Sequence, residues 1–350
     1  MPKDYDLITF GEAMVRLSSS SHMRLEAAMQ LDVSVGGAEW NVAVNAASLG
    51  LRTAWVSRLV DVWSGRLITN TARFHGVDCS HVVWVPFDGV GRVRNGFYHL
   101  EIGAGPRASS VTYDRGHSAV SLIAPDEVDW KALLARARWL HCSGITPALS
   151  ETLAETVVAA FRAANELGVR TSYDLNYRGK LWTPEQARET HALIVPHVKV
   201  LIGNEEDFEK VLGFKVEGVD ESLRDLPVEG YKRMVQTVVK AYPNIQAVGT
   251  TLREVVSGLI NNWSAILYYD GQFYESRRYE RLEIEDRVGG GDGFASGFTY
   301  GFLTGMSPQE CVEFGAANGA MLQTTRGDTC MVTLDEVIAV TKGATARIKR

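Results

Sequence analysis

The sequence is poor in cysteine: the 350 residues contain four, Cys79, Cys142, Cys311 and Cys330, which lie far apart and form no C-x-x-C pair. This spacing disfavours both a zinc site and a disulfide scaffold. Long apolar runs are also missing, since no segment approaches the roughly 18 apolar residues of a membrane span. The charged start, Met1 to Asp6, lacks the basic, apolar and small-residue order of a signal peptide. We therefore expect buried, reduced cysteines and a cytoplasmic protein.

The chain also lacks an excess of basic residues. Its formal charge of -6 argues against a nucleic-acid-binding protein, and no low-complexity or single-sign tract suggests a disordered arm. The basic end, Lys342 to Arg350, is interpreted as a solvated helix end rather than a patch for phosphate backbones. The expected partners are therefore small molecules, with no nucleic acid and no membrane.

Short apolar runs that end in Gly, Asp or Asn alternate with stretches of helical period, which is typical of βαβ units around a mostly parallel sheet. A chain of this length is predicted to form one large sheet domain with a smaller appendage. The predicted strands are Asp6 to Phe10, Ala54 to Arg58, Trp139 to Ser143, Arg170 to Asp174, Val198 to Gly203 and Ile245 to Thr250. The predicted helices are Glu151 to Leu167, Pro184 to Val195 and Tyr231 to Ala241.

Two segments, Glu12 to Val35 and Val93 to Tyr113, depart from this pattern because they carry alternating residues and have no strong helical face. We expect them to combine into a small β layer that projects from the main sheet. The second segment contains Asn95-Gly96, a dipeptide that signals a hairpin turn. Asp270-Gly271, between two short apolar runs, predicts another hairpin.

The sharpest chemical feature is Gly289-Gly290-Gly291-Asp292, which precedes a stretch with the periodicity of a buried helix. Three glycines let backbone N–H groups approach an anion, and a helix N-terminus favours phosphate. A carboxylate beside phosphate is better explained as a base that takes a proton from an attacking hydroxyl than as part of an anion site. In the alternative interpretation, Asp292 only caps its helix and the glycines only form a tight turn.

These residues carry a resemblance to a known family. Gly289-Gly290-Gly291-Asp292 resembles the G-A-G-D signature of the ribokinase (PfkB-type) carbohydrate kinases, with Gly290 in place of the usual alanine. Gly36-Gly37-Ala38-Glu39-Trp40-Asn41 resembles their Gly-Gly-x-x-x-Asn sugar motif. Asn204-Glu205-Glu206-Asp207 resembles their N-x-x-E motif for magnesium and phosphate, with Asp207 where glutamate is usual. The resemblance covers nearly all of the chain, and its motifs follow in the family's order.

The resemblance implies an ATP-dependent sugar kinase in which Asp292 is the base and the N–H groups of Gly289, Gly290 and Gly291 stabilise developing charge. It implies ATP and Mg²⁺ as cofactors and leaves a monovalent cation open. The nucleotide would lie beside Asn204, Thr251, Arg253, Gly289, Gly291 and Asn318. Asp207, with Glu206 as an additional candidate, would hold Mg²⁺ through water. Without the family context, Asn204 to Asp207 reads equally well as a helix N-cap with first-turn acids.

The fold implied by the resemblance is ribokinase-like α/β: a central, mostly parallel sheet flanked by helices, Rossmann-like, with a small β-sheet lid. The whole chain, 1–350, would be one kinase domain, with the lid built from about 12–35 and 93–115. The lid would close over the sugar and exclude water. Because lids in this family often pair, a homodimer through the lids is expected.

Within the family, three segments resemble the 2-keto-3-deoxygluconate kinases: Gly11 to Ser18, Tyr113 to Arg115 and Asp174 to Arg178. Their substrate carries a carboxylate, which the planar fork of arginine binds with two parallel hydrogen bonds. Arg115 and Arg178 are the candidates for this contact. The alternatives are that Arg115 is a solvated lid charge and that Arg178 neutralises ATP phosphates or an internal acid.

Other residues complete the expected acceptor site. Gly37 and Asn41 are predicted to contact sugar hydroxyls, whereas Tyr98 and Tyr113 either bond the substrate or fill the lid. Glu12 is expected to orient its neighbours rather than touch substrate.

Rival readings stay open at this point. A fructokinase, a 5-keto-2-deoxygluconate kinase or a nucleoside kinase would share the nucleotide motifs, and a non-catalytic sugar sensor would share the fold. A dinucleotide oxidoreductase is disfavoured because G-x-G-x-x-G is missing after the first strand. The glycine run itself is neither a Walker A loop nor a complete G-x-G-x-x-G, since Phe294 occupies the last position. The configuration of the acceptor, gluconate or galactonate series, is left open.

Overall fold

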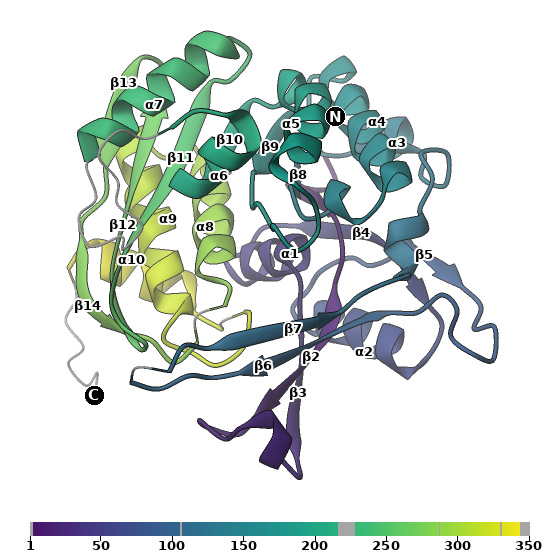
Figure 1. Ribbon diagram of the computed structural model, residues 1–350. Helices are drawn as coiled ribbons and strands as arrows, with labels where there is room; N and C mark the ends of the chain where they lie inside the picture. Colours follow the sequence, from purple (N-terminus) through teal and green to yellow (C-terminus); the bar gives the residue numbers. More distant parts are fainter. Residues whose placement is uncertain (1–2, 106, 216–227, 287, 330, 344–350) are drawn as a thin grey trace.

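In the computed structural model, which describes residues 3–105, 107–215, 228–286, 288–329 and 331–343, a large sheet forms the centre of the molecule (Figure 1). The strand order is β13-β12-β11-β10-β9-β8-β1-β4-β5, and β14 pairs with β12. The strands from β11 to β5 are parallel, whereas β12 is antiparallel to β11, β13 and β14. Their bounds are β1 (Leu7–Phe10), β4 (Thr53–Val60), β5 (Val82–Val85), β8 (Trp139–Ser143), β9 (Arg170–Asp174), β10 (Val200–Gly203), β11 (Ala247–Ser257), β12 (Ile260–Tyr269), β13 (Gln272–Glu275) and β14 (Tyr279–Glu283).

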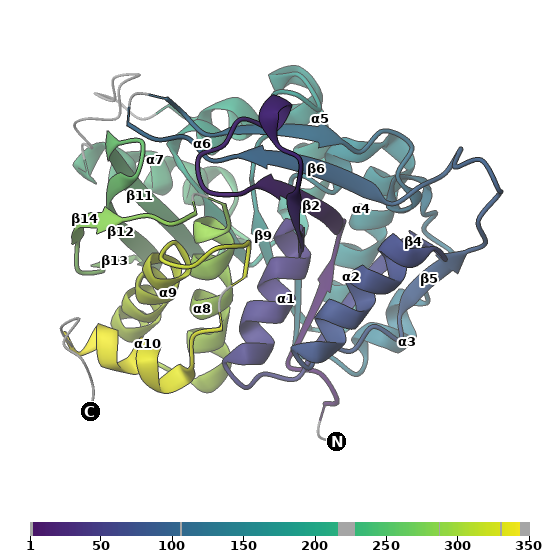
Figure 2. The same ribbon diagram turned by 90° about the horizontal axis from the view of Figure 1, so that it is seen from below.

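Helices cover both faces of this sheet (Figures 1 and 2). One face packs against α3 to α7, and the other packs against α1, α2, α8 and α9, with α10 on α9. Because both faces are covered, β8 and β10 are buried along their whole length. The bounds are α1 (Ala38–Ser48), α2 (Trp63–Phe74), α3 (Trp130–Leu134), α4 (Glu151–Glu166), α5 (Pro184–Ile194), α6 (Glu205–Leu212), α7 (Val228–Ala241), α8 (Gly290–Thr304), α9 (Pro308–Leu322) and α10 (Leu334–Thr341).

The six predicted strands and three predicted helices are all present, so the expected α/β fold with a mostly parallel sheet is confirmed. Helix α5 begins as its sequence suggests, with Pro184 in the first turn and a capping box between Thr183 and Gln186. Strand β11 is longer than predicted. It continues beyond Thr250 to Ser257 as an antiparallel ribbon with β12, and this pairing is not visible in local sequence.

A second, four-stranded sheet crosses the lower front of the molecule in Figure 1; we call it the small sheet. Its order is β3-β2-β6-β7, in which β2 and β6 are parallel and the outer pairs are antiparallel. The bounds are β2 (Met14–Ser19), β3 (Leu31–Gly36), β6 (Gly96–Glu101) and β7 (Ser110–Asp114). The two irregular segments of the sequence therefore meet in one sheet.

The two hairpin signals have different outcomes. Asp270 and Gly271 form the turn between β12 and β13 with φ values of 48° and 81°, so that prediction is confirmed. Asn95-Gly96 is not a turn, and that prediction is wrong. The Asn95 side chain instead accepts from the N–H of Val60 (2.9 Å) and donates to its C=O (3.0 Å), and Gly96 begins β6 beside the parallel strand β2.

The three cysteines that the structure describes, Cys79, Cys142 and Cys311, are buried and free, as expected. Cys330 lies outside the described residues, as does most of the basic end beyond Gly343. Within the described ranges, no helix has both the length and the apolar character needed to cross a membrane.

Candidate active site

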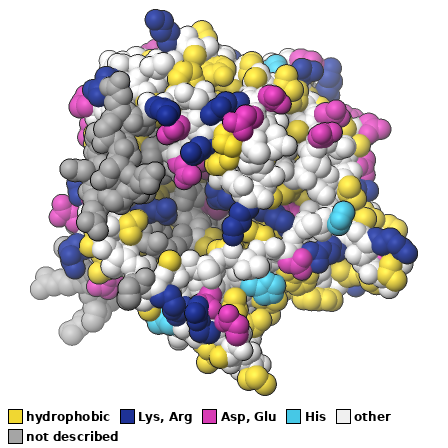
Figure 3. Space-filling view, in the orientation of Figure 1, with side chains coloured by type: hydrophobic (Ala, Val, Ile, Leu, Met, Phe, Trp, Pro, Cys, Tyr) yellow, Lys and Arg dark blue, Asp and Glu magenta, His cyan; other side chains and the backbone are white. Residues whose placement is uncertain are grey.

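The carboxyl ends of the central parallel strands open into a cavity of about 340 Å³, bounded on one side by the small sheet. Figure 3 shows the surface hollowed at the centre of this face, with charged side chains around the opening. Crevices at this edge of a parallel sheet are the usual binding sites of doubly wound folds. The predicted site residues that line the cavity are Gly37, Asn41, Tyr98, Tyr113, Arg115, Arg178, Asn204, Asp207, Thr251, Arg253, Gly289, Gly290, Gly291 and Asp292.

The glycine run forms the turn that starts α8. Gly289 is the N-cap residue with φ 89°, a left-handed conformation, and a Cβ there would lie 2.6 Å from the carbonyl oxygen of Asp328. A Cβ on Gly291 would meet no atom within 4 Å, because Gly291 faces the cavity. The backbone of this turn therefore lies open to a ligand at a helix N-terminus.

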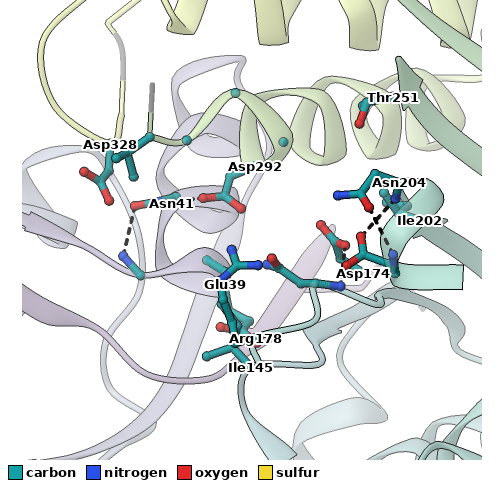
Figure 4. Close-up of a pocket in the computed structure, with 18 of the residues that line it drawn as sticks. Glu39, Asn41, Ile145, Asp174, Arg178, Ile202, Asn204, Thr251, Asp292 and Asp328 are labelled. Carbon is teal, nitrogen blue, oxygen red and sulfur yellow. Dashed lines mark hydrogen bonds between the residues drawn. The ribbon is translucent and has the colours of Figure 1, made fainter. Parts of the chain in front are cut away.

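Asp292 lies in the first turn of α8 and points into the cavity (Figure 4). The N-cap residue of α8 is Gly289, which has no side chain, and Asp292 is the acidic residue of the first turn. Oδ2 of Asp292 accepts from Nδ2 of Asn41 at 2.6 Å. Asp292 is therefore bonded to α1 in addition to its place in the first turn of α8.

The surroundings of Asp292 raise the pKa of its carboxyl group to about 7. Burial is the largest cause, and the negative charges of Asp328 and Glu39 add to it. The hydrogen bond from Asn41 and the positive charge of Arg178 act in the opposite direction. A carboxyl group with this pKa is suited to accept a proton near neutral pH.

The start of α1 supplies the next part of the cavity. Oδ1 of Asn41 accepts from the N–H of Gly37 at 3.2 Å, which orients its amide so that Nδ2 faces Asp292. Glu39 is buried beside it and accepts from the N–H of Ser143 (2.8 Å) and the hydroxyl of Thr146 (2.6 Å). Burial raises the pKa of Glu39, even though these hydrogen bonds lower it.

The small sheet contributes aromatic and charged side chains. Arg115 pairs through Nε and Nη2 with one carboxylate oxygen of Glu12, and its guanidinium lies 5.1 Å from the ring centroid of Tyr113. Both partners are shielded, with side-chain exposures of 9% for Arg115 and 2% for Glu12. Arg115 is therefore not a solvated charge. Glu12 orients a neighbour, as expected, and Tyr98 donates its hydroxyl proton to Asp328 at 2.6 Å.

Asn204 and Asp207 close a capping box at the start of α6. The Asn204 side chain accepts from the N–H of Asp207 (3.1 Å), and Oδ2 of Asp207 accepts from the N–H of Asn204 (2.9 Å). Oδ1 of Asp207 accepts from the N–H of Tyr177 at 2.8 Å. The helix N-cap that the sequence allowed is therefore present, and both residues also line the cavity.

A group of acids surrounds Arg178 between β9, β10 and α8 (Figure 4). Burial raises the pKa of Asp207 to about 6, and burial together with the charges of Asp207 and Asp292 raises the pKa of Asp174 well above its usual value. The positive charge of Arg178 lowers the pKa values of Asp174, Asp207 and Asp292. Arg178 therefore sits beside internal acids, one of the alternatives that its sequence left open.

Two candidates do not reach the cavity. Asn318 is 2% exposed and donates to the carbonyl of Gly293 (2.7 Å) and to Ser296 Oγ (3.1 Å), because α8 and α9 pack closely at their glycines. Glu206 is exposed and does not belong to the lining. The family resemblance implied that Asn318 lies beside the nucleotide and offered Glu206 as a candidate for Mg²⁺, but neither residue lines the cavity.

Three acidic lining residues were not assigned to the site from the sequence: Glu39, Asp174 and Asp328. Asp174 had a usable signal, because it ends a buried strand at the carboxyl edge of the sheet. Glu39 lies inside the Gly-Gly motif, where its burial had no sequence signal. Asp328 lies after α9, far along the chain from its partners, and only the tertiary structure brings it to the cavity.

Comparison with known proteins agrees with this geometry. Residues 5–334 match the family described as pfkB family carbohydrate kinase. A 2-dehydro-3-deoxygalactonokinase of Haloferax volcanii is 36% identical over 345 residues, which is 99% of each chain. A 5-dehydro-2-deoxygluconokinase of Halalkalibacterium halodurans is 26% identical over 342 residues, 97% of this chain and 95% of that protein.

A solved structure supports the same fold. The crystal structure of 2-dehydro-3-deoxygluconokinase from Thermotoga maritima superposes with a TM-score of 0.91 and 41% sequence identity. The match covers 97% of this chain and 100% of that one. The ribokinase-like architecture, with a large, mostly parallel sheet and a separate small sheet, is therefore confirmed.

Proposed function

Because this chain belongs to the pfkB family of carbohydrate kinases, we propose that it transfers the γ-phosphoryl group of ATP to the terminal hydroxyl of 2-keto-3-deoxy-D-gluconate. The products are ADP and 2-keto-3-deoxy-6-phosphogluconate. The observation that carries the proposal is the position of Asp292, a carboxylate with a raised pKa behind an open glycine turn. The Thermotoga maritima kinase, a 2-dehydro-3-deoxygluconokinase by name, supports this choice of acceptor.

In the proposed mechanism, Asp292 accepts the proton of the acceptor hydroxyl as that oxygen forms a bond to the γ-phosphorus. The bond from phosphorus to the bridging oxygen breaks, and ADP leaves with the electron pair. The N–H groups of Gly289, Gly290 and Gly291 stabilise the charge on the transferring group. Asn41 holds the Asp292 carboxylate in place, and its hydrogen bond at 2.6 Å supports this role.

The residues at the ends of β9 and β10 fit a water-coordinated Mg²⁺. Asp174 and Asp207 form a buried acidic pair whose pKa values are both raised, and a divalent cation would relieve this repulsion. Each oxygen of Asp207 already accepts one backbone N–H, which suits contact through water better than direct ligation. Bound there, Mg²⁺ would neutralise charge on the ATP phosphates. Asn204 and Asp207 would hold its water shell, whereas Glu206 is exposed and does not line the cavity.

We place the rest of the nucleotide along β11, beside Thr251 and Arg253, which line the cavity next to the glycine turn. Asn318 would act on the nucleotide only indirectly. Its two hydrogen bonds to the first turns of α8 support a role in holding the helix that carries Asp292.

The acceptor lies between the small sheet and α1 in this proposal. Arg115 and Arg178 bind its carboxylate, while Gly37 and Asn41 contact its hydroxyls and Tyr98 and Tyr113 close the sugar side. Arg115 donates to Glu12 through Nε and Nη2, and Arg178 donates to the carbonyl of Tyr177 through Nη1, so among the described residues each fork keeps a further donor for substrate. Glu12 holds Arg115 in a fixed orientation.

The small sheet is proposed to act as a lid that closes on the acceptor and keeps water from the transferring phosphoryl group. Three of its four strands, β2, β6 and β7, line the cavity through Met14, Tyr98 and Tyr113. Hydrogen exchange would test this motion: the acceptor should protect amides of β2 and β6 more than ATP alone does. Equal protection by the two ligands would contradict the proposal.

The deciding experiment is an acceptor panel in a coupled ADP-release assay. We expect the highest kcat/KM for 2-keto-3-deoxygluconate. The Haloferax volcanii relative favours 2-keto-3-deoxygalactonate as the second candidate, and the Halalkalibacterium halodurans relative favours 5-keto-2-deoxygluconate as a third. A preference for fructose or a nucleoside would overturn the sugar-acid assignment, and turnover of none of them would favour a sugar sensor.

A further inference from the structure

Arg16 is a buried cation outside the machinery described so far. It lies in β2 of the small sheet and is 2% exposed, one of the largest fully buried side chains of the described chain. Nη2 contacts the carboxylate of Asp286, Nη1 lies 2.6 Å from Oδ1 of Asp328, and Nε donates to Ser18 Oγ at 3.2 Å. All three guanidinium nitrogens are therefore engaged.

The partners of Arg16 belong to the segments that border the glycine turn. Oδ1 of Asp286 accepts from the N–H of Val288 at 3.1 Å, directly before Gly289. Oδ2 of Asp286 also accepts from the N–H of Gly327 at 3.2 Å, so this carboxylate joins the loops before α8 and after α9. One arginine of the small sheet thus holds the backbone that leads into the phosphate-facing turn.

Asp328, the second carboxylate bonded to Arg16, also contacts the small sheet through Tyr98. Oδ2 of Asp328 accepts from the hydroxyl of Tyr98 in β6, and Asp328 itself lines the cavity close to Asn41 and the start of α8 (Figure 4). Tyr98 lies on the acceptor side, whereas Gly289 packs against the carbonyl oxygen of Asp328. The cluster of Arg16, Asp286, Asp328 and Tyr98 therefore spans both halves of the cavity.

Stability alone does not explain this cluster. Buried ion pairs gain little or nothing over apolar residues of similar volume, because the ions lose their water. An arginine that is forked between two carboxylates does impose a fixed spacing and orientation on the groups that it joins. That geometric constraint is useful where two surfaces must meet in one arrangement.

We propose that Arg16 is a positioning residue that couples acceptor binding under the small sheet to phosphate binding at the glycine turn. Docking of the small sheet through Arg16 holds Asp286, and with it Val288 and the glycine turn, in the geometry that receives the phosphoryl group. Occupation of either half then favours the docked arrangement that the other half requires. The inference rests on the proposed function, since it assigns acceptor and phosphate to the two halves.

Isothermal titration and steady-state kinetics test the coupling. The ligands are a non-hydrolysable ATP analogue with Mg²⁺ and 2-keto-3-deoxygluconate, each titrated alone and with the other at saturation. The first variant is Arg16→Lys, whose ammonium lacks the fork that bridges two carboxylates. The second, Arg16→Met with Asp286→Asn, removes the bridge but keeps the net charge of the cluster, and Asp328 keeps its hydrogen bond from Tyr98. Arg138→Lys is the control, because Arg138 joins Asp6 and Leu303 away from the cavity.

In wild type and in Arg138→Lys, each ligand should tighten binding of the other by about fivefold or more, the lower end of typical coupling. Both Arg16 variants should bring this factor close to one, with each ligand alone changed less than about threefold, and should lower kcat by at least about tenfold. A wild type without coupling, or Arg16 variants that keep coupling and kcat while only melting earlier, would overturn the proposal. The titrations need no turnover, so a wild type that phosphorylates no sugar acid would refute the proposed function and leave the coupling to be judged separately.

Discussion

Asp292 combines the two properties that a general base needs at neutral pH, a fixed orientation and a raised pKa. Asn41 supplies the orientation through a bond of 2.6 Å, and burial with nearby acids supplies the pKa of about 7. Arg178 limits that rise because its charge favours the ionised form. At the scale of single residues, the site therefore holds several carboxylates and few cations, and their opposing charges act on the pKa of Asp292.

Replacement of Asp292 by asparagine should leave the fold and ATP binding intact, because the side chain is nearly isosteric. Turnover should fall by roughly two to four orders of magnitude, the usual effect of losing a general base. Single-turnover phosphoryl transfer measures this step directly. Wild-type rates in Asp292→Asn would show that another group accepts the proton.

The pKa of about 7 also predicts how activity depends on pH. Only the ionised carboxylate accepts a proton, so kcat/KM for the acceptor should fall about tenfold for each pH unit below roughly pH 7. Initial rates between pH 5 and 8 at saturating ATP test this. A flat profile over this range would contradict the assignment.

Stability should change with pH in the opposite direction. The Asp292 pKa is about 7 in the folded chain and about 3.9 when unfolded, so the folded state binds more protons between these values. This group's contribution to stability is therefore largest below about pH 4 and is lost as the pH rises to about 7. Asp292→Asn should melt above wild type at pH 8, and the difference should shrink toward pH 4. Equal differences at both pH values would count against the raised pKa.

Arg115 is expected to discriminate acidic from neutral acceptors. Truncation of Arg115 alone would leave Glu12 buried without its partner, so the informative variant is Arg115→Met with Glu12→Gln, which removes both charges together. A charge-assisted hydrogen bond contributes roughly 1.5–3 kcal/mol, so kcat/KM for the sugar acid should fall about ten- to over a hundredfold. The kcat/KM for a neutral sugar should change little. Equal losses on both acceptors would assign Arg115 to structure or nucleotide.

At the scale of elements, the glycine turn and α8 form one unit that presents N–H groups and a carboxylate together. Gly289 and Gly291 differ in what surrounds them. Gly289 has a left-handed conformation, and a side chain there would meet the backbone of Asp328. A side chain at Gly291 would instead enter open space in the cavity. Substitutions at the two positions therefore test the conformation of the turn and the space for the ligand separately.

Gly289→Ala should lower the melting temperature and abolish turnover, because the turn itself must shift. Gly291→Ala should melt within a few degrees of wild type and should raise KM for ATP, since its methyl group occupies space that the phosphates would use. Thermal unfolding without ligand and ATP kinetics separate the two effects. An unchanged KM in Gly291→Ala would place the phosphates elsewhere in the cavity.

At the scale of the whole molecule, the small sheet has an exposed edge. Leu31 and Val33 of β3 are 36% and 54% exposed, and among the described residues β3 pairs only with β2, so its outer edge is apolar and invites a partner. We propose a homodimer through the small sheets. Val33→Asp should shift the chain toward monomer, whereas Leu193→Asp, an exposed apolar position on α5, should not.

Light scattering coupled to size-exclusion chromatography measures this difference at tens of micromolar protein. The prediction would be wrong if wild type were monomeric under these conditions. It would also be wrong if the two substitutions had the same effect on the mass.

The sequence by itself determined the main elements and pointed to the proposed centre of the chemistry. Strands such as Trp139 to Ser143 and helices such as α5 follow from local periodicity, caps and proline, and these signals act within a few residues. The run from Gly289 to Asp292 is equally local, because its glycines and its carboxylate are neighbours in the chain. Local patterns thus predicted the α/β fold and the position of the proposed base.

Only the tertiary structure decided which distant groups face one another. Arg115 pairs with Glu12 across 103 positions, and Arg16 joins Asp286 and Asp328 across 270 and 312. Asn318 turns toward α8 rather than the cavity because two glycine-rich helix faces pack closely. Such contacts depend on how sheets and helices stack, and the free energy of a buried charge depends on the partner that stacking provides. No pattern within one segment of the sequence contains that partner.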